Sequence, residues 1–299
     1  MTDAVPFRAG HVALVGRPNV GKSSLLNALI GQRLCIVSPR PQTTRHRILG
    51  VATREAGQIG YLDTPGIHSG TGKALNRQLN RTAHTALSGA DVCVHVVEAL
   101  RFGAEDRAVA EAALAAGIPC ILAINKIDRV KDKTQLLPFI AEVATGRDYA
   151  GVFLVSARRQ TGLEDLERAV IAALPEQEPL YEVDTLTDRS ERFLAAELLR
   201  EQLMRHLGQE LPYSTTVEIQ QFVSEGRLRR IHAVIWVERE GQKAIVIGEK
   251  GERLREMASK ARVAMEALFD GRVFLETWVK VRRGWSDDER ALREFGYAE

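Results

Sequence analysis

The sequence predicts an α/β domain with a mixed, mostly parallel six-stranded sheet, followed by a smaller α+β domain. Up to about Leu174, short β-rich runs alternate with helical patterns, which is typical of βαβ units around a parallel sheet. The stretch from Pro175 to Leu186 contains two prolines, acidic residues and little periodicity, which indicates a linker. Beyond it the expected order of elements changes to α-β-β-α-α-β. We therefore expect domains over 1–175 and 188–299, joined by residues 176–187.

The first domain is expected to alternate strands with helices. The strands are expected over 11–16, 48–53, 58–63, 91–97, 119–125 and 151–156, and the helices over 23–30, 74–87, 104–116, 133–145 and 163–173. Only a few residues around Gly57 join the second strand to the third, too few for a crossover helix. That pair is therefore expected to be an antiparallel hairpin, in a sheet with helices on both faces.

The second domain is expected to begin with a helix from Thr187 to about His206, capped by Asp188. Two strands, over 215–223 and 231–238, should follow. The remaining elements are a short apolar segment at 244–247, the loop 248–251, a long amphipathic helix over 252–269, a last strand over 273–281 and a polar tail with some helical pattern.

The composition is that of a soluble globular protein. With 299 residues, 45% of them hydrophobic, the chain can bury a core without disulfides or metal, which excludes intrinsic disorder. Its longest apolar stretches fall well short of the ~20 residues that span a bilayer, so we expect a cytoplasmic protein. The three cysteines have no metal-ligand spacing and should be reduced packing residues. A net charge of +2 creates no global field, so any nucleic-acid site must be a local patch.

The segment Gly16–Ser23 matches the phosphate-binding pattern G-x-x-x-x-G-K-[ST] between a predicted strand and a predicted helix. Its glycines let the backbone curl so that N–H groups point at phosphates, where the helix N-terminus adds positive potential. Lys22 would hold the β and γ phosphates, and the Ser23 hydroxyl would bind Mg²⁺. The alternative, a tight strand–helix turn without a ligand, is disfavoured by this context.

The segment Asp63-Thr64-Pro65-Gly66 lies where the third predicted strand ends. There the Asp63 carboxylate can reach Mg²⁺ through water, and the Gly66 N–H can sense the γ-phosphate. Taken alone, this segment would be an ordinary turn. Placed after a phosphate-binding loop, it indicates a Walker-B-type switch.

The segment Asn125-Lys126-Ile127-Asp128 follows an apolar strand, at the edge where open α/β sheets bind ligands. The Asp128 carboxylate can accept hydrogen bonds from guanine N1–H and its 2-amino group, whereas adenine offers an acceptor at N1 and no amine at C2. An unpaired buried carboxylate is costly, so the predicted substrate is a guanine nucleotide. Ser156 and Ala157 can buttress the base, although this pair is by itself a weak signal.

These motifs in this order, with Gln42-Thr43-Thr44-Arg45-His46-Arg47 between the first two, resemble the translation-factor-related GTPases, and specifically the bacterial Era GTPase family. The resemblance covers essentially the whole chain. It implies hydrolysis of GTP to GDP and phosphate with Mg²⁺, and it makes the Gln-Thr-Thr-Arg segment the first switch. Analogy with related GTPases selects Thr44 over Thr43 as the Mg²⁺ ligand beside Ser23 and Asp63.

The catalytic set implied in this way is Lys22, Thr44, Asp63 and Gly66. The implied nucleotide contacts are Gly16, Arg17, Pro18, Asn19, Val20, Gly21, Lys22, Ser23, Ser24, Asp63, Thr64, Pro65, Gly66, Ile67, Asn125, Lys126, Asp128, Ser156 and Ala157.

Ile67 stands where Ras-type enzymes carry the glutamine that orients the attacking water. An isoleucine side chain cannot hydrogen-bond, so intrinsic hydrolysis should be slow, on the order of a Ras-like 10⁻⁴–10⁻³ s⁻¹. Related GTPases that lack this glutamine use a phosphate-loop asparagine to help hold a potassium ion, which makes Asn19 and K⁺ candidates here. The alternative is that Asn19 only shapes the loop.

The segment Gly248–Gly251 is a weak G-x-x-G signal that gains weight from its position between two helical segments. The order α-β-β-α-α-β around it is that of a type II KH domain, whose glycines let about four nucleotides of RNA approach. A solvated helix face, with basic residues paired to neighbouring glutamates, is the bland alternative. The expected RNA-binding residues are Lys243, Ile247, Gly248, Glu249, Lys250, Gly251, Arg253 and Leu254.

The resemblance further implies that this domain binds the 3′ end of small-subunit (16S) ribosomal RNA and acts on the 30S subunit, as a monomer. Association with the inner face of the cell membrane is left open. Two alternatives are a signalling GTPase whose second domain binds a protein or a membrane, and an RNA-modifying enzyme. The RNA-modifying enzyme is disfavoured because the second domain offers no nucleophile, metal cluster or extra cofactor motif.

Four other residues are candidates for functional groups. His95 is expected to be a packed core residue, and Trp236 and Trp278, which alternate with apolar residues on strands, are also expected in the core. Trp285 lies in the tail beside two arginines, where stacking on a base and simple packing are both open.

Overall fold

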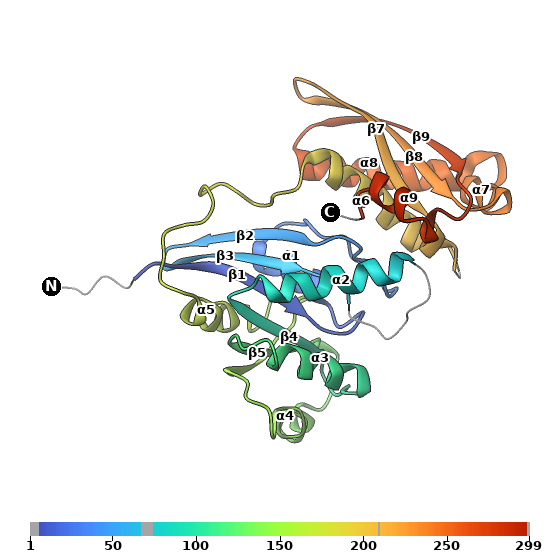
Figure 1. Ribbon diagram of the computed structural model, residues 1–299. Helices are drawn as coiled ribbons and strands as arrows, with labels where there is room; N and C mark the ends of the chain where they lie inside the picture. The colour runs from blue at the N-terminus through green and yellow to red at the C-terminus, as the bar shows by residue number, and fades with distance from the viewer. Residues whose placement is uncertain (1–5, 67–73, 209, 298–299) are drawn as a thin grey trace. The chain divides into compact units, whose positions relative to one another are not determined.

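A computed structural model describes residues 6–66, 74–208 and 210–297 (Figure 1). The chain divides into two compact units. The N-terminal unit comprises Met1–Cys35, Thr44–Gly70 and Leu79–Asp188, and the C-terminal unit comprises Ile36–Thr43, Thr71–Gln78 and Arg189–Glu299. The division therefore falls inside the predicted first switch, between Thr43 and Thr44.

The N-terminal unit is built on a six-stranded sheet in the order β2-β3-β1-β4-β5-β6. Its strands are β1 (Arg8–Val15), β2 (Ile48–Arg54), β3 (Gly57–Asp63), β4 (Val92–Glu98), β5 (Cys120–Asn125) and β6 (Gly151–Leu154). Only β2 and β3 pair antiparallel, and the other neighbours are parallel. The mixed sheet and its hairpin are thus confirmed.

Helices cover both faces of this sheet. They are α1 (Lys22–Ile30), α2 (Ala74–Ser88), α3 (Ala104–Leu114), α4 (Leu136–Ala144) and α5 (Leu163–Ala173), with short 3₁₀ turns η1 (Ile127–Arg129) and η2 (Lys133–Gln135). On β2, Leu49 and Val51 pack with Ala86 of α2. Gly50 points to the opposite face, where an added Cβ would lie 3.0 Å from side-chain carbons of Leu26 in α1. The alternation along one strand therefore places one helix on each side.

The C-terminal unit has the element order expected from its sequence. Its helices are α6 (Glu191–His206), α7 (Glu240–Ile247), α8 (Glu252–Phe269) and α9 (Glu289–Glu294), and its strands are β7 (Thr216–Glu225), β8 (Leu228–Val237) and β9 (Arg272–Val281). Three 3₁₀ turns, η3 (Leu211–Ser214), η4 (Glu249–Gly251) and η5 (Trp285–Asp287), complete the unit. The sheet order is β7-β8-β9, antiparallel and then parallel. Side chains of α6, α8 and the inner sheet face, such as Leu199, Met265 and Ile235, form one hydrophobic core.

Three sequence-based expectations for this unit were wrong. Trp236 is half-buried and outside the hydrophobic core, and its indole N–H donates a hydrogen bond to Glu218 at 2.8 Å. Helix α6 begins at Glu191 because the Ser190 side chain accepts a hydrogen bond from the Phe193 N–H and caps the helix, so Asp188 is not the cap. Trp278 is 43% exposed and lies outside the core. Its neighbours in β9, such as Val279, face the core, and strand alternation turns Trp278 to the opposite face.

The tail packs against its own unit. Trp285 is fully buried, stacks on Tyr297 with ring centroids 6.1 Å apart, and donates its indole N–H to the Ser214 carbonyl at 3.2 Å. Packing is therefore its structural role. Within the part of the chain that the structure describes, no helix combines the length and the apolar composition needed to cross a membrane.

Candidate functional site

The phosphate-binding loop joins the end of β1 to the start of α1. Two of its glycines are required by close approach. An added Cβ at Gly16 would lie 2.5 Å from the Val96 carbonyl oxygen, and one at Gly21 would lie 2.5 Å from the Asn125 amide nitrogen. Gly21 also has a φ of 103°, which L-residues rarely adopt. The loop therefore needs glycine at both positions, and Ser24 follows in the first turn of α1.

The Lys22 side chain is buried inside this loop. Its Nζ donates hydrogen bonds to the carbonyl oxygens of Gly16 at 2.9 Å and Arg17 at 3.1 Å. Burial lowers the pKa of Lys22 to about 8, against the opposing attraction of Asp63. A phosphate group at the loop would add negative charge where the ammonium lies, which favours the charged form of Lys22.

Three oxygen-bearing side chains of the N-terminal unit converge beside Lys22. The Ser23 hydroxyl donates to Asp63 Oδ2 at 2.6 Å, the Thr44 hydroxyl donates to the same oxygen at 3.1 Å, and the two hydroxyl oxygens are 2.8 Å apart. Burial raises the pKa of Asp63, while Lys22 and the two hydroxyls oppose that rise. Among the described residues, the buried Oδ1 of Asp63 has no hydrogen-bond partner.

This donor set suits Mg²⁺, which prefers oxygen ligands, usually one or two carboxylates completed by water and phosphate. The structure brings Thr44 rather than Thr43 to this point. The Thr43 hydroxyl instead lies 2.6 Å from the Ser38 hydroxyl and donates to the Arg40 carbonyl at 2.8 Å. Over the described ranges no group of three or more His, Cys, Asp or Glu side chains could hold a metal.

The segment after Asp63 lies against the phosphate loop. The Thr64 hydroxyl donates to the Leu14 carbonyl at 3.0 Å, and an added Cβ at Gly66 would lie 2.8 Å from the backbone nitrogen of Pro18. Gly66 thus packs its backbone on the loop, with Pro65 between these two contacts. Ile67 lies outside the described residues.

The base-binding loop follows β5 and is held by the Asn125 side chain. Its amide donates to the Val20 carbonyl at 3.0 Å, and its oxygen accepts from the backbone N–H groups of Lys126 at 2.8 Å and Ala157 at 3.1 Å. One side chain therefore joins the phosphate loop to both segments predicted to surround guanine.

Asp128 is the residue expected to select guanine. Its Oδ1 accepts a hydrogen bond from the Ser156 hydroxyl at 2.7 Å, and this bond holds the pKa of Asp128 below its usual range. An ionised carboxylate is an acceptor only, which suits a base edge that presents two donors.

Sequence reasoning missed two acidic side chains at the same edge of the sheet. Glu98, at the end of β4, lies 2.7 Å from the Lys126 ammonium. Asp106, in the first turn of α3, accepts from Arg17 Nε with both carboxylate oxygens, at 3.1 and 3.0 Å. The place of Glu98 at the carboxyl end of β4 was a usable signal, because ligands bind at that edge.

His95 is the core residue that its position in β4 predicted. It is fully buried, and its Nδ1 lies 2.9 Å from the Tyr149 hydroxyl. Burial lowers the pKa of His95 to about 3, so the ring is neutral at physiological pH. All three cysteines are buried, and none of them is in a disulfide.

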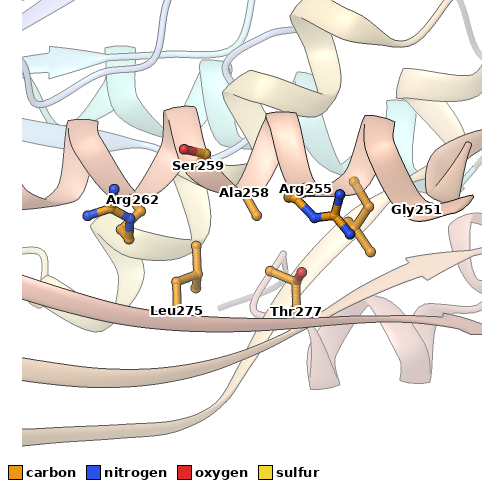
Figure 2. Close-up of a pocket in the computed structure, with 8 residues that line it drawn as sticks. Gly251, Arg255, Ala258, Ser259, Arg262, Leu275 and Thr277 are labelled. Carbon is orange, nitrogen blue, oxygen red and sulfur yellow. The ribbon is translucent and has the colours of Figure 1, made fainter.

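In the C-terminal unit, a groove runs between α8 and β9, beside the G-x-x-G loop (Figure 2). Gly251, Leu254, Arg255, Ala258, Ser259 and Arg262 line it from the helix side, and Leu275 and Thr277 line it from the strand. Two arginines thus flank small residues along α8, and Figure 2 shows Arg255, Ala258 and Arg262 on the side of the helix nearer to Leu275 and Thr277.

Of the expected RNA-binding residues, Gly251 and Leu254 line this groove. The others, Lys243, Ile247, Gly248, Glu249, Lys250 and Arg253, lie in α7, in the loop or at the start of α8. The loop backbone is left-handed at Gly248 and Gly251, with φ of 72° and 79°. An added Cβ at Gly248 would lie 2.7 Å from Arg253 Cβ, whereas one at Gly251 meets no atom within 4 Å. Gly251 is therefore the open side of the loop.

Comparison with known proteins finds relatives for both parts of the chain. A family model described as "50S ribosome-binding GTPase" matches residues 11–126, and a KH domain model matches residues 210–286. The GTPase Era of Stenotrophomonas maltophilia (strain R551-3) is 57% identical over 297 residues, covering 99% of this chain and 100% of that protein. The GTPase Era of Xanthomonas campestris pv. campestris (strain B100) is 56% identical, with the same coverage.

Two solved structures resemble the whole chain. One is an Aquifex aeolicus Era variant bound to GDP and AlF₄⁻, and the other is Era in complex with MgGDPNP and nucleotides 1506–1542 of 16S ribosomal RNA. Each is 36% identical, has a TM-score of 0.94, and covers 98% of this chain and 100% of its own. The chain is a GTPase with a P-loop domain followed by a KH domain, and it belongs to the Era GTPase family.

Proposed function

We propose that the chain is a GTP-driven switch that binds small-subunit ribosomal RNA near its 3′ end and acts in assembly of the 30S subunit. The main support for this proposal is that one chain contains both a candidate nucleotide site and a candidate RNA site. Ser23, Thr44 and Asp63 converge within 3.1 Å beside the phosphate loop, and a groove flanked by arginines adjoins the G-x-x-G loop. The relative bound to 16S ribosomal RNA supports the small subunit as the partner.

At the nucleotide site, Ser23 and Thr44 would hold Mg²⁺ directly and Asp63 would hold it through water. Bound there, the ion neutralises charge on the β and γ phosphates. Lys22 holds these phosphates, the amides of the phosphate loop surround them, and the Gly66 N–H senses the γ-phosphate. The Gly66 backbone already packs on Pro18, which supports this assignment.

Guanine is selected by Asp128, which Ser156 keeps ionised and oriented. Asn125 fixes the loop that carries Asp128. The Ala157 N–H donates a hydrogen bond to the Asn125 side-chain oxygen, close to where the guanine carbonyl would bind. The remaining nucleotide contacts from Gly16 to Ser24, and from Thr64 to Ile67, keep the roles that the family resemblance implies.

Hydrolysis is slow because Ile67 cannot orient the attacking water. We propose K⁺, held with the help of Asn19, as the compensating charge between the β and γ phosphates. Such a charge stabilises the transition state in the way that an arginine finger does.

The RNA lies along α8, with its backbone on the glycine loop and its bases over the groove. Arg255 and Arg262 would bind phosphates, and Leu254 and Leu275 would contact bases. We propose that this KH domain spans 188–299, that the GTPase domain spans 1–175 with the linker at 176–187, and that the protein is a cytoplasmic monomer. Peripheral membrane binding is an outcome of the test below.

The test is titration of the full chain with an RNA oligonucleotide of the 16S 3′ end and with a scrambled control. Affinity should prefer the 3′ end and fall steeply between about 50 and 200 mM salt, because bound phosphates release counterions. Binding to anionic vesicles without any RNA binding would instead support a signalling GTPase at a membrane.

A further inference from the structure

The buried Glu98 carboxylate lies within 4.0 Å of four cationic side chains. Its oxygens lie 2.7 Å from Lys126 Nζ, 3.6 Å from Arg101, 3.8 Å from Arg17 and 4.0 Å from Arg129. Burial by itself raises the pKa of Glu98, but the hydrogen bond and charge of Lys126 outweigh burial and hold that pKa below its usual range. Glu98 is therefore anionic, and Lys126 is its hydrogen-bond partner.

Lys126 connects the base-binding loop to the phosphate loop. Its Nζ donates to the Asn19 carbonyl at 2.5 Å as well as to Glu98 at 2.7 Å. Both Asn19 and Lys126 have left-handed backbones, with φ of 64° and 65°. The ammonium thus lies between a phosphate-loop carbonyl and a carboxylate at the end of β4.

We propose that Glu98 is a positioning residue for guanine-nucleotide binding. It fixes the Lys126 ammonium against the Asn19 carbonyl, and so holds the phosphate loop and the base-binding loop at the separation that one nucleotide must span. This inference rests on the nucleotide site described above.

We do not expect Glu98 to influence nucleotide binding through Arg17, Arg101 or Arg129. Arg17 is already held by both oxygens of Asp106, so its place does not depend on Glu98. Arg101 and Arg129 are 72% and 63% exposed, and ion pairs of such exposed groups contribute little. The effect of Glu98 should therefore pass through Lys126.

Whether substitution of Glu98 weakens or tightens nucleotide binding distinguishes a positioning role from a purely electrostatic one. Nucleotide phosphates are anionic, so a nearby carboxylate repels them, and removing its charge would by electrostatics alone tighten binding. Positioning predicts the opposite. Glu98→Gln should weaken GDP and GTP binding about 10-fold, since a hydrogen bond between charged groups is lost. At saturating GTP, the rate of hydrolysis should stay within about twofold, because the γ-phosphate machinery is untouched.

The experiment measures dissociation constants for GDP with full-length variants. Glu98→Asp keeps the charge but shortens the side chain, and it should also weaken binding, whereas a pure charge effect predicts no change. The matched control is Glu105→Gln, which removes one exposed carboxylate at the start of α3. That variant should bind GDP within about twofold of the unsubstituted chain or slightly tighter.

A double-mutant cycle then tests whether the effect of Glu98 on GDP affinity depends on Lys126. In a Lys126→Met background, Glu98→Gln should change GDP affinity by less than about twofold, because the group that it positions is gone. Unchanged or tighter GDP binding by Glu98→Gln would overturn the proposal, as would a full additional loss in the Lys126→Met background. Failure of the unsubstituted chain to bind GDP would instead refute the nucleotide site itself.

Discussion

The Ser156 hydroxyl donates a hydrogen bond of 2.7 Å to Asp128 Oδ1, so the loop after β6 orients the carboxylate that we expect to face the base. If Asp128 reads guanine N1–H and the 2-amino group, Asp128→Asn should weaken GTP binding by at least about 100-fold and favour xanthosine triphosphate. Titration with both nucleotides checks this. Ser156→Ala keeps the carboxylate and should show a smaller loss of the same kind. GTP affinity that stays unchanged in Asp128→Asn would rule out base reading by this residue.

Potassium should accelerate hydrolysis relative to sodium at constant ionic strength if Asn19 helps to hold K⁺ beside the phosphates. The test variant is Asn19→Gly, because glycine tolerates the φ of 64° that alanine would strain. It should erase the difference between the two salts with modest loss of nucleotide affinity. Asn19→Ala should behave in the same way if strain is small. Equal rates in both salts would point to an activating group supplied by RNA or the ribosome.

Negative charge on the glycine loop should expel RNA phosphates. Placing Asp at both Gly248 and Gly251 should abolish binding to the 16S 3′ end while GTP hydrolysis stays intact. The cleaner comparison is at Gly251, where an added Cβ meets no atom within 4 Å. There Asn and Asp share shape and tolerate a left-handed backbone, so Gly251→Asp should lose much more RNA affinity than Gly251→Asn. RNA binding by the double Asp variant at the unsubstituted level would place the site elsewhere.

Nucleotide and RNA should be thermodynamically coupled. The predicted first switch is divided between the two compact units at Thr43 and Thr44, and we therefore expect the γ-phosphate to influence RNA binding. A non-hydrolysable GTP analogue and GDP should therefore give different RNA affinities. By linkage, RNA must change the ratio of analogue to GDP affinity by the same factor. Equal RNA affinities in the two nucleotide states would leave only a kinetic effect.

Nucleotide binding should take up protons near pH 8. The pKa of Lys22 is lowered to about 8 by burial, and phosphates would raise it again. GDP affinity should accordingly fall as pH rises through 8, where free Lys22 loses its proton. Calorimetry in two buffers of different ionisation enthalpy measures the uptake. Lys22→Arg stays charged throughout this range and should show none, so equal uptake by that variant would assign the proton to another group.

Local patterns predicted the sheet, the hairpin and the order of the C-terminal unit, because periodicity, glycine turns and motif spacing are properties of short segments. Contacts between distant segments were not predictable in that way. Leu275 and Thr277 join the groove through the pairing of β9 beside β8, and Glu98 meets Lys126 because β4 and β5 are neighbours. Trp278 alternates with apolar residues, but alternation does not say which face of a sheet is covered.

The single amide of Asn125, bonded to Val20, Lys126 and Ala157, also bears on kinetics. Because one amide ties three loops together within the fold, ordering these loops is part of folding, and we expect less of their conformational entropy to be lost on binding. Association is then limited by diffusion and orientation, as expected for a preformed pocket. The lifetime of the GDP-bound state should then be set by how fast GDP leaves, whereas hydrolysis also ends the GTP-bound state.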